Sequence, residues 1–167
     1  MNRFFIFFFL TIPTVFGVSI DRSSLPIHEP AVPAIKEMDV RNAKAPPMFQ
    51  IKAPKKTPNV LIILIDDMGF GQPGTFGGPV KMPNLEKLSN QGLRYNNFHT
   101  TALCAPTRMA LQTGRNHHTA NTGSITETAT NFPGNTSVRP TSVAPLAEIL
   151  KQNGFSTAAF GKWHETA

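Results

Sequence analysis

Cys104 is the only cysteine among the 167 residues, and it lies in the segment TTALCAPTRMALQTGR, where its side chain could react. Pro106 suits the first turn of a helix that continues through Leu111, which places Cys104 at the helix N-terminus. Exposed backbone N–H groups and the positive end of the helix dipole favour an anion there, and Arg108 adds a positive charge one turn along. The alternative is a small buried hydrophobe, the usual state of a free cysteine. The pattern favours an oxyanion site around Cys104.

A second group that could do chemistry is the acidic pair Asp66-Asp67, which directly follows the six apolar residues 60–65. Adjacent carboxylates near a buried strand repel each other and need a cation to offset that repulsion. An oxygen-only pair with no Cys or His beside it suits a hard ion, calcium or magnesium, better than zinc. The alternative is a solvated turn. The pair therefore predicts a cation site.

The third group, Lys162 with His164, ends the segment FSTAAFGKWHE, whose small and aromatic residues are typical of a buried strand. The apolar run 60–65 has no polar alternation and predicts a strand buried on both faces of a mostly parallel sheet. In open α/β sheets, ligands gather beyond the carboxyl ends of the strands. We therefore expect the acidic pair and the Lys162 segment to meet at one edge of a sheet.

Helix and strand signals alternate between these groups. MPNLEKLSNQG, 82–92, has leucines at helical spacing and a terminating glycine, and GLRYNNFHTT, 92–101, predicts a strand. SVAPLAEILKQNG predicts a helix capped by Ser142 and ended by Gly154. Strands separated by helices imply an α/β fold, here a mostly parallel sheet with helices on both faces.

The charge distribution argues against a nucleic-acid partner. Residues 1–58 hold eight Lys and Arg against four Asp and Glu, while 59–167 hold eight against six, so most of the net charge of +6 precedes the α/β pattern. No basic run extends beyond Lys55-Lys56, and no aromatic residues are interleaved with it. We therefore expect no nucleic-acid binding.

The N-terminal residues 1–17 are typical of a secretory signal peptide, with Arg3 before the apolar run 4–16 and cleavage after Gly17. The run is shorter than the roughly 20 residues that a membrane span needs, and no cysteine offers a lipoprotein anchor. An uncleaved signal anchor is the alternative. Residues 18–58, rich in proline, predict a linker or wrapping arm before a domain at 59–167. We expect an exported protein, periplasmic or secreted, with no stable membrane anchor.

Three motifs together resemble the sulfatase family of the alkaline-phosphatase-like superfamily. CAPTR matches the family's CxPxR signature, and CAPTRMALQTGR matches its extension. NVLIILIDDMGFG resembles the family's first metal-binding strand, and GFSTAAFGKWH resembles the later strand with Gly-Lys-Trp-His. The motifs occur in the family's order with compatible spacing and cover about 58–165.

The resemblance implies the hydrolysis of sulfate esters. In sulfatases the motif cysteine, here Cys104, is oxidised during export to Cα-formylglycine by a formylglycine-generating enzyme that reads CxPxR in the unfolded chain. One hydroxyl of the hydrated aldehyde attacks the sulfur and expels the alcohol, and the second hydroxyl then expels sulfate. A lone cysteine in an exported chain thus needs no disulfide partner.

The family's site residues carry over by motif. One calcium ion would be held by Asp66, Asp67 and the modified Cys104. The remaining catalytic roles would fall to three further residues: Arg108 holding the formylglycine, Lys162 binding sulfate oxygens, and His164 deprotonating the second hydroxyl.

The sequence departs from the family pattern in two places. Thr107 stands where serine is commoner, and Glu165-Thr166 stands where many relatives have Leu-Gly. No motif supports His99, His117 or His118 as site residues.

Two other functions stay open. A phosphonate or phosphodiester hydrolase of the same superfamily would use the same site, and a truncated, non-catalytic chain would keep only the N-terminal region. Calcium takes about 6–8 oxygen ligands, and the family completes its metal site with residues from a later motif, absent before Ala167. We therefore expect the N-terminal part of a catalytic domain, with exposed apolar strand faces and little or no turnover by itself.

Overall fold

The computed structural model describes residues 20–32 and 34–165. The chain divides into two compact units, Met1–Phe49 and Gln50–Ala167, and every candidate site residue lies in the second. The predicted signal peptide 1–17 lies outside the described residues. No helix in the described ranges is both long enough and apolar enough to cross a membrane.

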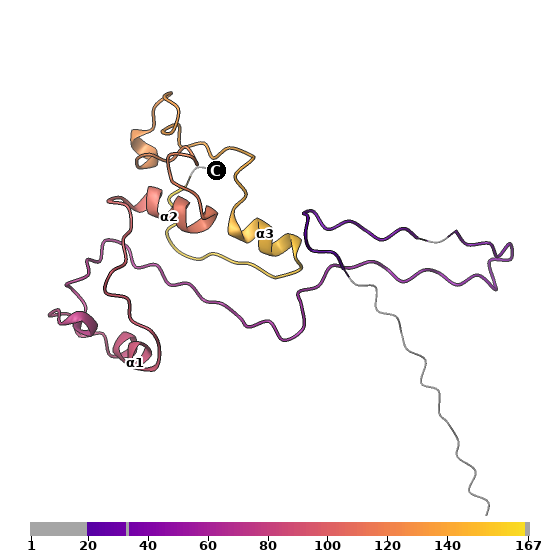
Figure 1. Cartoon of the computed structure of the whole chain (residues 1–167), viewed down its shortest axis with the longest axis horizontal. Coiled ribbons are helices and arrows are strands. Elements are labelled where there is room, and N and C mark those ends of the chain that lie inside the picture. Colours follow the sequence, from indigo (N-terminus) through magenta and orange to yellow (C-terminus); the bar gives the residue numbers. More distant parts are fainter. Residues whose placement is uncertain (1–19, 33, 166–167) are drawn as a thin grey trace, which may run out of the picture. The chain divides into compact units, whose positions relative to one another are not determined.

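The helices of the second unit are short (Figure 1). Three are α-helices and two are single 3₁₀ turns among the described residues; in chain order they are η1 (Gly74–Phe76), α1 (Pro83–Gln91), α2 (Cys104–Thr113), η2 (Thr126–Thr128) and α3 (Leu146–Gln152).

The helices α1 and α2 begin and end where local signals place them. Proline occupies the first turn of α1, which ends before Gly92, so the helix predicted over 82–92 is confirmed. Cys104 is the first residue of α2, as its sequence predicts. Gly114 ends α2 in the left-handed region at φ 63° and donates its N–H to the carbonyl of Ala110. Cys104 therefore lies at the N-terminus of a ten-residue helix that ends at Thr113.

The helix α3 is shorter at its N-terminus than predicted. Ser142 does not cap it; the N-cap is Pro145, without a side-chain hydrogen bond. A proline excludes the preceding residue from the helical region, so no helix can run from Ser142 through this point. The predicted stop is correct: Gly154 follows the helix at φ 85° and its carbonyl accepts the N–H of Ala53 at 3.2 Å.

No strand forms in the described part of the chain, and the sheet predicted for 60–65, 92–101 and 155–165 is absent there. One isolated parallel bridge joins Pro73 and Val80. A parallel strand is stable only between paired neighbours and under covering helices. Without these, the apolar run stays extended and exposed, with Leu61 83% exposed. The expected exposure of apolar residues is thus observed, but not on strand faces, and the expected buried strand is not confirmed in the described part of the chain.

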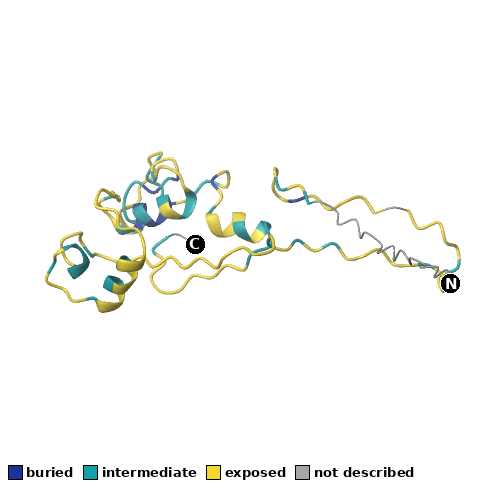
Figure 2. Ribbon diagram, turned by 60° about the horizontal axis from the view of Figure 1, so that its bottom comes forward, coloured by how far each residue is buried: buried dark blue, intermediate teal, exposed yellow. Residues whose placement is uncertain are grey.

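A small core surrounds α2 and the loop after it, where most of the buried residues of this unit lie (Figure 2). Met109 of α2 packs with Ala120 and Val143, all buried, and α2 also contacts α3. The Val143 carbonyl accepts a hydrogen bond from the guanidinium of Arg139. The core therefore holds α2 in place, and with it Cys104 and Arg108.

Candidate functional site

Arg108 joins three segments that are distant in sequence. Its side chain is only 10% exposed because α2 directs it inward from the turn after Cys104. One terminal nitrogen donates to the backbone carbonyl of Lys162 at 2.7 Å, and the other to Asp66 Oδ1 at 3.0 Å. A guanidinium presents several donors in a rigid planar fork, so one side chain can serve both acceptors. Arg108 thus ties the acidic pair and the Lys162 segment to α2.

Asp66 has a cation on each carboxylate oxygen. Lys162 Nζ lies 2.5 Å from Oδ2, opposite the Arg108 contact on Oδ1. The hydrogen bond from Lys162, followed by that from Arg108, holds the pKa of Asp66 below its usual value. The same bond raises the pKa of Lys162. Asp66 is therefore an ionised carboxylate shared between two positive side chains.

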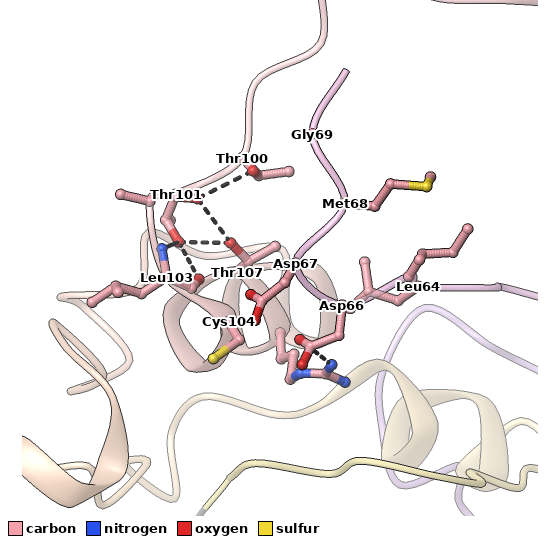
Figure 3. A pocket seen from close by; sticks show the side chains of 13 residues that line it. Leu64, Asp66, Asp67, Met68, Gly69, Thr100, Thr101, Leu103, Cys104 and Thr107 are labelled. Atoms are coloured by element: carbon pink, nitrogen blue, oxygen red, sulfur yellow. Dashed lines mark hydrogen bonds and ion pairs between the residues drawn. The ribbon is translucent and has the colours of Figure 1, made fainter. Parts of the chain in front are cut away.

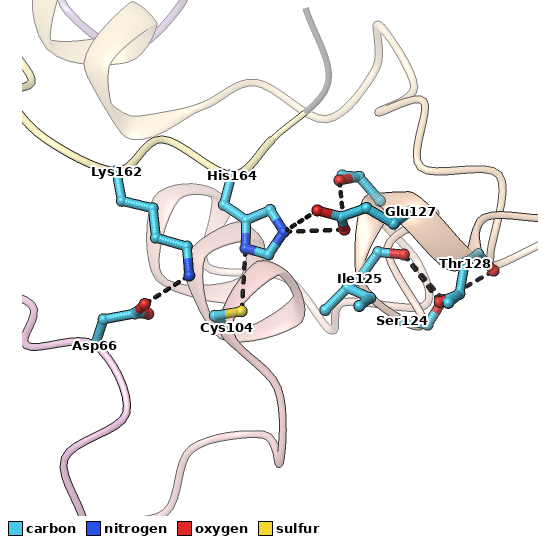
Figure 4. A network of polar contacts seen from close by, with 9 residues as sticks. Asp66, Cys104, Ser124, Ile125, Glu127, Thr128, Lys162 and His164 are labelled. Atoms are coloured by element: carbon cyan, nitrogen blue, oxygen red, sulfur yellow. Dashed lines mark hydrogen bonds and ion pairs between the residues drawn. The ribbon is translucent and has the colours of Figure 1, made fainter.

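His164 links Cys104 to a carboxylate that the sequence motifs do not include (Figure 4). Its Nδ1 lies 3.0 Å from Cys104 Sγ. Its Nε2 lies 3.1 and 3.2 Å from the two carboxylate oxygens of Glu127 in η2. The hydrogen bond with His164 lowers the pKa of Glu127. The only sequence signal for Glu127 is that no other acidic residue lies between Glu86 and Glu148.

An open pocket of about 310 Å³ lies beside these groups, lined by 64–69, 100–104 and two residues of α2, Thr107 and Arg108. Figure 3 shows Asp66 and Asp67 beside Cys104 at the head of α2. Asp67 has φ 54°, a left-handed conformation that is unfavourable for residues with a Cβ. The pocket thus brings the acidic pair and the cysteine to one place, as the sequence predicts.

Of the predicted metal ligands Asp66, Asp67 and Cys104, the two carboxylates match calcium in donor type, whereas the unmodified thiol of Cys104 does not. Carboxylate oxygens suit a hard cation, yet calcium takes about 6–8 oxygens. No group of three or more His, Cys, Asp or Glu in the described ranges could hold a metal ion. Both oxygens of Asp66 already contact cationic side chains. The carboxylates thus suit calcium by donor type, but the described residues supply too few oxygens to hold it by themselves.

Comparison with known proteins assigns the chain to a family. The model of the sulfatase family matches residues 58–167, which include all of these groups. The chain belongs to the sulfatase family. This family implies an α/β fold of the alkaline-phosphatase type, and the resemblance found in the three motifs is confirmed.

Several curated sulfatases resemble this chain over about two thirds of its length. An uncharacterized sulfatase of Schizosaccharomyces pombe is 39% identical over 123 residues, 70% of this chain and 22% of that protein. The arylsulfatase of Klebsiella aerogenes is 33% identical over 114 residues, 67% of this chain and 25% of that enzyme. Arylsulfatase G of Mus musculus is 41% identical over 111 residues, 64% of this chain and 20% of that enzyme. The chain spans about a fifth to a quarter of the length of these relatives.

Glu165 of this sulfatase is a further carboxylate near the site. Both its oxygens are buried without a hydrogen-bond partner in the described part of the chain. Burial raises its pKa to about 7, against the opposing charges of His164, Arg108 and Arg139.

The three other histidines of the sulfatase domain make contacts away from Cys104. His99 bonds to Asn97, and His117 stacks on His118 with ring centroids 4.3 Å apart. Their placement agrees with the absence of a motif around them.

Proposed function

We propose that this sulfatase hydrolyses sulfate esters with a nucleophile derived from Cys104. The arrangement that carries the proposal is the contact of Cys104 Sγ with His164 Nδ1, at the head of α2, beside the ion-paired Asp66. The names of similar proteins support the reaction class, since arylsulfatase, steryl-sulfatase and N-acetylgalactosamine-6-sulfatase are all named for sulfate groups. These names differ in the alcohol, so the proposal is restricted to the sulfate ester.

The nucleophile requires the oxidation of Cys104 to Cα-formylglycine by a formylglycine-generating enzyme. Hydrated, this aldehyde supplies two hydroxyls on one carbon, one for attack on sulfur and one to expel the sulfate. His164 Nδ1, 3.0 Å from the present sulfur, is placed to accept a proton from a hydroxyl at that carbon. The free N–H groups at the start of α2 favour negative charge beside it.

Arg108 and Lys162 stabilise charge in the proposed reaction. Arg108 is nearly buried and held by two acceptors, so its guanidinium is a fixed positive group behind Cys104. Lys162 is 45% exposed and bonded to Asp66, and its ammonium can turn toward a bound sulfate oxygen. Arg108 thus orients the groups of the site, and Lys162 contacts the sulfate group of the substrate.

Asp66 and Asp67 would hold one calcium ion together with an oxygen of the modified Cys104. When bound, the ion supplies positive charge that offsets the negative oxygens of the sulfate group. Asp66 Oδ2 now accepts from Lys162, so calcium and Lys162 compete for this oxygen. The missing ligands would come from other parts of the full-length enzyme.

The architecture proposed for the complete domain is a mostly parallel sheet with helices on both faces, of which 59–167 is the N-terminal part. Segments 60–65 and 155–160 would be strands in it, because each is apolar or small and ends in site residues. Both segments are largely exposed in the second unit, as expected for strand-forming segments that have no neighbouring strand there.

The proposed route of the protein is export, with 1–17 as a signal peptide and 18–58 as a linker or arm. Export accounts for the exposure of CxPxR to the formylglycine-generating enzyme before folding. N-terminal sequencing of the exported protein should begin after Gly17. Recovery of Met1 on exported soluble protein would contradict the signal peptide.

The central test combines mass spectrometry with an activity assay on the chain co-expressed with a formylglycine-generating enzyme. The peptide that contains Cys104 should carry an aldehyde in place of the thiol, and Cys104→Ala should not. The converted chain should release the alcohol of an aryl sulfate above the level of Cys104→Ala, at least once per site.

Three outcomes would contradict the proposal. An alkylatable thiol at full occupancy would exclude the modification. Conversion without any release of the alcohol would exclude the catalytic role. Preferential cleavage of an aryl phosphodiester would favour the phosphodiester hydrolase instead.

A further inference from the structure

We propose that Glu127 is a positioning residue for His164: its carboxylate accepts the Nε2–H and thereby directs the unprotonated Nδ1 toward Cys104. The inference rests on the proposed function, because it takes His164 as the base of that reaction. Glu127 lies outside the three motifs, and its role follows from its contacts.

His164 lies between Cys104 and Glu127, with one ring nitrogen toward each (Figure 4). The distances from Nε2 to the two Glu127 oxygens are 3.1 and 3.2 Å, and that from Nδ1 to Sγ is 3.0 Å. The imidazole is therefore held at both nitrogens by groups 23 residues apart in the chain. Rotation of the ring would break both contacts.

The chemistry of the partners determines the tautomer. An ionised carboxylate can only accept hydrogen bonds, so the contact with Glu127 requires a proton on Nε2. A neutral imidazole carries one proton, and Nδ1 is then left with a lone pair toward Cys104. The hydrogen bond that lowers the pKa of Glu127 keeps this carboxylate ionised near neutral pH. A base for a hydroxyl at Cys104 needs this tautomer.

The backbone conformation of His164 indicates that the contacts of its side chain hold the residue in place. Its φ is 53°, in the left-handed region, which is unfavourable for a residue with a Cβ. The side chain is nevertheless only 13% exposed, held between Cys104 and Glu127. Glu127 itself is 65% exposed and belongs to a single 3₁₀ turn, so its removal leaves the core around Met109 untouched.

The first test reads the histidine directly and needs no turnover. In ¹⁵N-histidine-labelled chain, His164 should give a one-bond Nε2–H correlation with a downfield proton that exchanges slowly with water. His164→Gln assigns the signal among the five histidines. The signal should disappear in Glu127→Ala and persist in Glu148→Ala, which removes an equally charged, exposed carboxylate elsewhere in the unit.

The second test is a double-mutant cycle in the aryl sulfate assay. Glu127→Ala should lower kcat by about 10-fold with KM unchanged, since loss of the partner behind a functional histidine costs about 10–100-fold. In the His164→Gln background the same substitution should cause no further loss. Glu127→Gln, which keeps the size and one acceptor oxygen, should recover part of kcat.

The outcomes separate this inference from the proposed function. A His164 signal that is absent from the wild-type chain, or unchanged in Glu127→Ala, would overturn the positioning role whatever the activity. An equal fall in kcat with and without His164 would also overturn it, because Glu127 would then act by another route. An intact, Glu127-dependent signal in a formylglycine-containing chain that releases no alcohol would overturn the sulfatase proposal alone.

Discussion

Arg108→Lys should loosen the segment that carries Lys162 and His164 from α2. The guanidinium of Arg108 bonds both the Lys162 carbonyl and Asp66, whereas the ammonium of lysine is a point charge that reaches one of them. If lysine keeps the contact with Asp66, the bond to the carbonyl is lost. A hydrogen bond from a charged donor contributes about 1.5–3 kcal/mol. Because the Arg108 side chain is 90% buried, water cannot replace that bond freely.

Trp163 is a fluorescence probe within the segment that Arg108 holds. It is the only tryptophan, lies between Lys162 and His164, and is half-exposed. Its fluorescence should report detachment of this segment in urea. With a urea dependence of about 1–3 kcal/mol per M, the midpoint should fall by about 1 M in Arg108→Lys.

The matched control is Arg115→Lys, an exposed arginine just after the same helix, which should leave the midpoint unchanged. Equal midpoints for the wild type, Arg108→Lys and Arg115→Lys would refute the reasoning. Arg108 would then carry no part of the attachment, and the bond at 2.7 Å would be worth less than its burial implies.

Three further predictions test the packing and the charges around the site. Met109→Ala should destabilise α2 by about 2 kcal/mol, the low end for a buried methionine in a small core, measured by helical circular dichroism in urea. Gly154→Ala should cost at least about 1–3 kcal/mol in the same measurement, because a Cβ there would lie 2.6 Å from the carbonyl carbon of Lys52 at φ 85°. Glu165 has a folded pKa of about 7 against 4.5 unfolded, so its neutral form contributes stability below pH 4.5 that is lost as pH rises to 7. Glu165→Gln should match the wild type at pH 4.5 and be more stable by about 1–2 kcal/mol at pH 8 in urea unfolding, less than the full pKa shift implies because Glu165 as a whole residue is only partly buried.

Local signals in the sequence determined the helices at the site. Pro106 and Gly114 define the start and the end of α2 within ten residues, and they place Cys104 at its head in any environment that lets the helix form. The same kind of signal gave α1. These interactions join residues a few positions apart, so no distant partner can change them.

The motifs also predicted which distant residues would meet. Asp66, Cys104, Arg108 and Lys162 lie close together in the second unit, although no strand forms in the described ranges to align them. Hydrogen bonds of the buried Arg108 suffice for this, because an unpaired guanidinium in the interior would be costly.

Tertiary structure alone decided the rest of the site. The contact between Glu127 and His164 joins residues 37 positions apart in the chain. It depends on the path of an irregular loop, and no periodic pattern in the sequence predicts that path. Whether residues 60–65 form a strand also depends on neighbouring segments. Their apolar side chains predict a strand, but a strand needs a neighbouring strand whose backbone groups hydrogen-bond to its own backbone. The residue types thus determined the chemistry that is possible here, whereas long-range hydrogen bonds decided which atoms face one another.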